Sequence, residues 1–157
     1  MTLKDQKHYA PWLWLLLGLF GFRVIAQLLQ SRFALPFLPA FEHWQGSSLP
    51  YGALFASQLL ILFLFATIAW RFSTGRAAAC PVVGVVMLSL GGFYFSVMFV
   101  RLALGLTVLS HSYWFASHLP ALFHLVLASF LLLVGHFHWR NRKTGCQHRK
   151  GDSLPAR

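Results

Sequence analysis

The fold of this chain is decided by residues 51–72, which read YGALFASQLLILFLFATIAWRF. The run is almost continuously apolar and has the length, about 20 residues, that a helix needs to cross about 30 Å of hydrocarbon. It ends in Trp70 and Arg71, an aromatic ring and a cation of the kind found where a helix leaves the membrane. The stretch therefore predicts a membrane-spanning helix.

Three other stretches have the same character, and the whole composition agrees with them. Of the 157 residues, 57% are apolar and 10% are charged, whereas soluble domains carry about 25% charged residues. The other predicted spans lie at about residues 11–30, 82–109 and 113–139, the last shortening to 120–139 if Pro120 opens the helix instead of kinking it. We therefore predict an all-α integral membrane protein.

The predicted architecture is a four-helix antiparallel transmembrane bundle formed by residues 1–140 and followed by a basic tail, residues 141–157. Between the first two spans, residues 31–50 contain three prolines and several aromatic residues, so this segment is too broken for a spanning helix and too apolar for an ordinary loop. We expect it to form an outer interfacial cap segment over the bundle.

The net charge of +10 follows from membrane topology and does not indicate nucleic-acid binding. Ten of the thirteen basic residues fall in the N-terminal tail, in the link 71–76 and in residues 140–157, which all lie on one side of a four-span arrangement. Because basic residues stay inside, we expect a multi-pass protein of the bacterial inner (cytoplasmic) membrane with both termini cytoplasmic. In the reducing cytoplasm Cys80 and Cys146 would remain thiols.

Polar residues inside the spans share one depth. Arg23 and Arg101 each lie about 10 Å, seven residues, from the outer end of their span, and Gln58 falls at the same level. His124 joins them if the last span begins at Pro120, and Gln27 lies one turn from Arg23 on the same face. Since a charged side chain within a span costs roughly 2.5–3.5 kcal/mol, these residues should face the interior of the bundle.

The two arginines suggest a ligand site. Glu42, in the cap segment, is the one carboxylate expected on the outer side, so it can neutralise only one of them. We therefore predict a polar pocket near the periplasmic leaflet that binds an anionic lipid, a quinone-like molecule or another small ligand through Arg23, Gln27, Gln58, Arg101, His124 and Glu42. The competing interpretation is that the arginines only snorkel to headgroups or hold the helices together.

The histidines give little support for a metal or a haem. A haem between two histidines needs ligands on facing helices, but every histidine inside a span belongs to the last one. An outer metal site combining His43, His111 and His118 is chemically possible, although the spacing is not diagnostic. We therefore leave the cofactor unknown and expect neither group.

No pattern of residues indicates catalysis. The chain has no nucleophile beside a base, no phosphate-binding glycine loop, no CxxC pair and no paired carboxylates on the outer side. We predict a small binding or accessory protein that contacts membrane lipids and has a membrane-protein partner or forms a homo-oligomer. The alternatives are an oxidoreductase or lipid-modifying enzyme that uses the same pocket, and a structural subunit or assembly factor of a larger complex.

Overall fold

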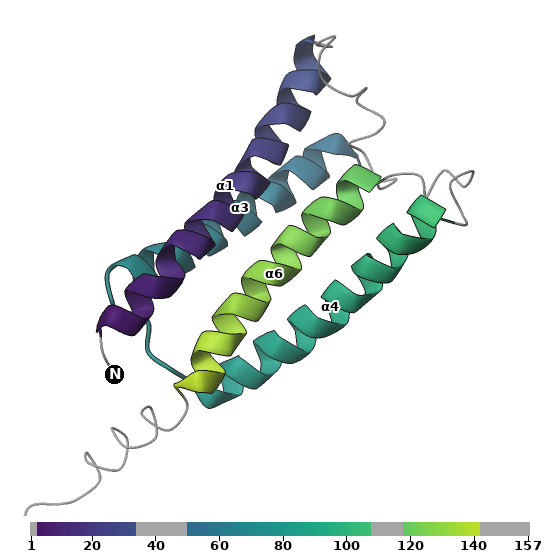
Figure 1. The fold of residues 1–157 in the computed structure, drawn as a ribbon. Coiled ribbons are helices and arrows are strands. Elements are labelled where there is room, and N and C mark those ends of the chain that lie inside the picture. The colour runs from purple at the N-terminus through teal and green to yellow at the C-terminus, as the bar shows by residue number, and fades with distance from the viewer. Residues whose placement is uncertain (1–2, 34–49, 108–117, 142–157) are drawn as a thin grey trace, which may run out of the picture.

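The computed structural model describes residues 3–33, 50–107 and 118–141, and these residues are helical with one short link (Figure 1). No strand occurs among them. The helices, in chain order, are α1 Leu3–Phe33, α3 Tyr51–Ser73, α4 Pro81–Thr107 and α6 His118–Arg140.

All four helices are long and apolar enough to cross a membrane. Within the described residues, the prediction of four helices that are each long and apolar enough to span a membrane is therefore confirmed. Helices α3 and α4 begin within one residue of the predicted spans, and α6 begins at His118, between the two alternative starts. The predicted cap segment at 34–49 and the tail from residue 142 lie outside the described residues.

Helix α1 begins earlier than the predicted span. It starts at Leu3, so Pro11 lies inside the helix instead of opening it. Proline there removes one backbone hydrogen bond, a cost that a helix tolerates where the freed carbonyl can meet water or headgroups. Pro11 is exposed near the end of the bundle, which fits that requirement.

The helices pack in a row, with α1 and α6 in the middle. Helix α1 contacts both α3 and α6, while α4 packs closely against α6, as Figure 1 shows. Because α3 and α4 are the flanking helices, each presents most of its apolar side chains to the outside. The buried positions of α4 are three glycines and Arg101.

Small residues set the close approach of α4 to α6. An added Cβ on Gly84 would lie 2.9 Å from the backbone nitrogen of Trp139, and one on Gly135 would lie 2.8 Å from that of Leu88. Such contacts are shorter than real side chains make, so glycine is required there. Gly92 behaves differently, because nothing lies within 4 Å of its Cβ position.

One end of the bundle, here called the link end, contains the link 74–80 between α3 and α4. The side chain of Gln6 clamps this link: its Nε2 donates to the carbonyl of Ala77 at 2.9 Å, and its Oε1 accepts from the Ala77 N–H at 3.3 Å. Tyr9 Oη lies 3.0 Å from His136 Nδ1, and these contacts join the first turns of α1 to the link and to the last turns of α6. The opposite end, where α1 ends and α6 begins, is called the far end.

The core at the link end is aromatic. Phe65 of α3 stacks on Phe130 of α6 with centroids 3.9 Å apart, and Phe137 packs edge-on against Phe72 at 4.6 Å. Buried alanines and Leu13 complete the cluster. Toward the far end the interior changes from aromatic to polar, and this change positions the candidate site.

Candidate ligand site in a buried polar layer

Two arginines occupy the interior toward the far end. Arg23 of α1 is 4% exposed and Arg101 of α4 is 7% exposed. Both interact electrostatically with Tyr94 and with His124, so the four side chains belong to one group although they come from three helices. The sequence predicts one depth for Arg23 and Arg101, and for His124 if the last span begins at Pro120; the structure adds Tyr94 to this group.

Helix α6 supplies the aromatic surface between the two arginines. The guanidinium carbon of Arg23 lies 5.5 Å from the ring centroid of Phe123, within the range of a cation–π contact. The next residue, His124, faces the other side, where its ring lies 5.8 Å from that of Tyr94 in a tilted arrangement. Phe123 was not singled out by the sequence analysis, since a phenylalanine in an apolar span carries no distinguishing pattern.

Glutamines extend the group to the fourth helix. Gln27 is fully buried one turn beyond Arg23, and its Oε1 accepts a 3.1 Å hydrogen bond from Nε2 of Gln58 on α3. Gln30 continues the same face of α1 and is also buried. We call the whole set the polar layer, and its members are Arg23, Gln27, Gln30, Gln58, Tyr94, Arg101 and His124.

The glutamine pair leaves hydrogen-bonding capacity unused. Among the described residues, Nε2 of Gln27 and Oε1 of Gln58 have no hydrogen-bond partner, and neither does Oε1 of Gln30. Exchanging oxygen and nitrogen in both paired amides would still leave one donor and one acceptor without a partner. Because buried polar atoms are nearly always satisfied, and more so in a membrane interior, these atoms call for a further polar group.

The layer carries positive charge. The chain has three carboxylate side chains, and Asp5 lies in the opposite half of α1, about 27 Å along the helix from Arg23. Glu42 falls outside the described residues, and even paired with one arginine it would leave the layer net positive. The chemical groups that match such a layer are phosphate, carboxylate and carbonyl oxygens.

The predicted metal site is only partly within the described residues. His118 lies at the start of α6, at the far end, and its Nδ1 is buried without a hydrogen-bond partner there. His43 and His111 lie outside the described ranges. Within those ranges, no three metal-binding side chains come together.

The histidines near the end of α6 have specific partners. His136 pairs with Tyr9, and the Nδ1 of His138 accepts from the backbone N–H of Cys80 at 3.1 Å. These roles cannot be read from spacing, because both partners are distant in the chain. The same holds for Gln6 and its partner Ala77.

Comparisons of the chain with protein-family models, with curated proteins and with solved structures gave no match. Any assignment of function therefore has to come from the residues of the site itself.

Proposed function

We propose that this chain is a small binding or accessory protein of the bacterial inner membrane, with an antiparallel four-helix bundle, cytoplasmic termini and an outer cap. Its polar layer recognises the anionic or strongly hydrogen-bonding group of an amphiphilic ligand near the periplasmic leaflet. The basic residues of the link end support this orientation, since Lys7, Arg71, Arg76 and Arg140 all lie there.

One observation carries the proposal: Arg23 and Arg101 come from helices that flank α6 and act on the same Tyr94 and His124. Arginines that serve only to snorkel would each extend toward the headgroups from the outer face of a helix. Two buried arginines on separate helices can both donate to one planar or tetrahedral oxyanion.

The unsatisfied amide atoms support the same proposal. Gln27 and Gln58 are almost fully buried and have a donor and an acceptor left over, so a ligand carrying both charge and a hydroxyl or carbonyl group would meet both needs. Lipid headgroups and quinones are membrane molecules with these features. An apolar tail would lie along the exposed apolar faces of the bundle.

The test is to identify what co-purifies with the protein. Organic extracts of the purified protein, analysed by mass spectrometry, should contain a defined anionic lipid or quinone whose amount depends on Arg23 and Arg101. Arg23→Lys and Arg101→Lys keep the charge but lose the planar, multidentate donor arrangement, so each should reduce the retained ligand about tenfold or more, as expected for loss of one charge-assisted hydrogen bond.

Arg32→Lys is the matched control, because Arg32 is an exposed arginine in the last turn of the same helix. Retention should be unchanged in this variant. Equal retention of the ligand in all three variants would show that Arg23 and Arg101 do not hold it. Membrane fractionation measures whether each variant still inserts, and so distinguishes lost binding from lost folding.

A further inference from the structure

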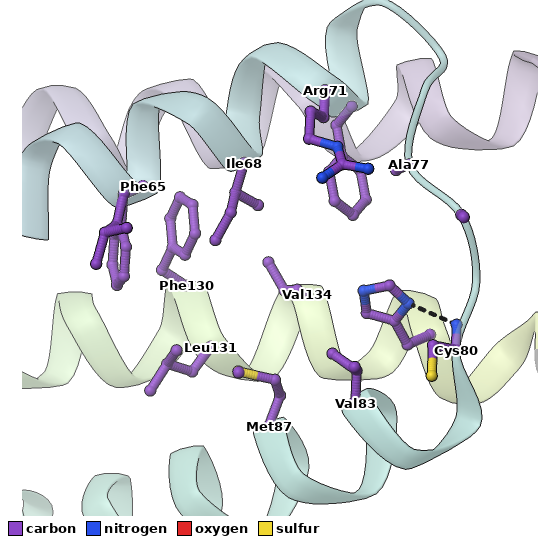
Figure 2. Close-up of a pocket in the computed structure, with 14 residues that line it drawn as sticks. Phe65, Ile68, Arg71, Ala77, Cys80, Val83, Met87, Phe130, Leu131 and Val134 are labelled. Atoms are coloured by element: carbon purple, nitrogen blue, oxygen red, sulfur yellow. Dashed lines mark hydrogen bonds between the residues drawn. The ribbon is translucent and has the colours of Figure 1, made fainter.

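A second cavity lies at the link end, away from the polar layer. Its volume is about 510 Å³, and it is formed by α3, the link, α4 and α6. Figure 2 shows Phe65 and Ile68 on one side, facing Phe130, Val134 and Met87 on the other. The cavity exists because α3 and α4 flank the row of helices and do not close against each other along their length.

The lining of the cavity is apolar except at one end. There the side chain of Arg71 is directed from α3 into the space between the helices (Figure 2). His138 and Cys80 line the same end, where the backbone N–H of Cys80 donates to Nδ1 of His138. The cavity thus has an apolar body and a polar end, as an amphiphile does.

The polar end offers donors. Since Nδ1 of His138 accepts a hydrogen bond, the proton of the neutral imidazole is on Nε2, which has no hydrogen-bond partner among the described residues. Arg71 adds a permanently charged guanidinium. Arg76 and Arg140 lie at the same end of the bundle and make it positive, so the complementary group is an anion.

The volume distinguishes a lipid chain from a protein segment. A cavity of about 510 Å³ lies within the roughly 300–1,000 Å³ of small-molecule sites. An α-helix about 10 Å across would fill that volume in a length of about 6.5 Å, little more than one turn, which is too short to dock a partner helix. A single acyl chain is narrow and apolar and suits the lining.

We propose that the cavity at the link end binds one acyl chain of an anionic phospholipid, whose phosphate is held by Arg71 and by the Nε2–H of His138. The site is independent of the polar layer, because it shares no residue with it. It places a structural lipid beside α6, between α3 and α4, which do not pack closely against each other.

The thiol of Cys80 gives a direct readout. With Cys146→Ser as the background, Cys80 is the one remaining cysteine, and its reaction with N-ethylmaleimide can be followed in nanodiscs of phosphatidylcholine alone or with phosphatidylglycerol. We expect phosphatidylglycerol to slow the labelling of Cys80 about tenfold, because the headgroup held beside Cys80 covers the thiol. Inorganic phosphate in phosphatidylcholine nanodiscs should leave the labelling unchanged, because it has no acyl chain to hold it in the cavity.

Two arginine variants separate binding at the site from general attraction to negative charge. Arg71→Ala should abolish the slowing, whereas Arg76→Ala removes the same charge from the same end without touching the cavity and should retain it. Equal labelling in the two lipids would overturn the proposal, as would slowing that persists in Arg71→Ala.

Native mass spectrometry provides a second measurement that does not depend on the thiol. Val83→Trp should fill the cavity and reduce bound phosphatidylglycerol by one molecule per chain, while Leu90→Trp, on an exposed face of the same helix, should not. The proposal would be contradicted if Val83→Trp bound as much phosphatidylglycerol as the wild type. It would also be contradicted if the wild type formed a lipid-free dimer, because a second copy of the chain would then be the occupant of the cavity.

Discussion

At the scale of single residues, the interior toward the far end depends on polar side chains that a membrane protein ordinarily avoids. Their burial was predictable from sequence, because charge and amide groups within apolar spans must face inward. The sequence places Gln58 at the depth of Arg23 and Gln27 one turn beyond it, and the structure pairs the two amides. The arrangement of Arg23 over Phe123 was not predictable, since it depends on the rotation of α6 relative to α1.

The glutamine pair makes a testable prediction for stability. Gln27→Leu or Gln58→Leu alone leaves the other amide buried with fewer partners and should lower the free energy of unfolding by about 1–3 kcal/mol. The double variant should lose less than the sum of the two single losses, because no amide is then left stranded. Denaturant unfolding in detergent measures this, and strictly additive losses would show that the two amides do not act as a pair.

The clamp of Gln6 on the link makes another prediction at this scale. Gln6→Ala removes two hydrogen bonds to Ala77, so the free energy of unfolding should fall by about 1–3 kcal/mol. Lys7→Ala is the control, because Lys7 is the exposed neighbour in the same helix. If thermal unfolding in detergent gives the same midpoint for both variants, the link is not held by Gln6.

At the scale of elements, sequence was a good guide to the helices and a poorer one to their ends. The apolar runs predicted the first residues of α3 and α4 to within one position, because Pro50 precedes the first helix and Pro81 begins the second. The start of α1 was placed at Pro11, eight residues too late for the helix, because polar residues after Leu3 read as a tail. That turn is helical and is held by tertiary contacts of Gln6 and Tyr9, which no local pattern encodes.

The contact between α4 and α6 can be tested through its glycines. Gly135→Ala forces a Cβ against the backbone of Leu88 and should destabilise the protein by about 1–3 kcal/mol through overpacking. Gly92→Ala meets open space and should be neutral or stabilise by up to about 1 kcal/mol, because alanine favours the helix. Unfolding curves should therefore shift toward lower stability for Gly135→Ala but not for Gly92→Ala, and equal shifts would mean that the close approach does not depend on Gly135.

At the scale of the whole molecule, the row of helices separates two environments. The polar layer lies toward the far end, and Lys7, Arg71, Arg76 and Arg140 lie at the link end, where the core is aromatic. Sequence predicted this division from hydropathy and charge. The short link between the second and third spans predicts that these two helices are neighbours, whereas the structure packs α3 against α1 and α4 against α6. Their apolar faces give no information about which neighbour covers them.

The orientation in the membrane gives a prediction for the intact protein. A reporter fused after Arg157 should be active only in the cytoplasm, and one inserted between Thr107 and His118 only in the periplasm, because ten of the thirteen basic residues were assigned to the cytoplasmic side. The reverse pattern would place the polar layer near the cytoplasmic leaflet and change the set of ligands that can reach it.

Native mass spectrometry of the intact protein released from its own membrane measures directly whether the arginines of the polar layer hold a ligand. In addition to the lipid proposed at the link end, we expect the wild type to carry one discrete adduct more than the Arg23→Lys, Arg101→Lys double variant, and we expect Arg32→Lys to keep that adduct. Identical adducts in the wild type and the double variant would contradict a ligand held by the two arginines.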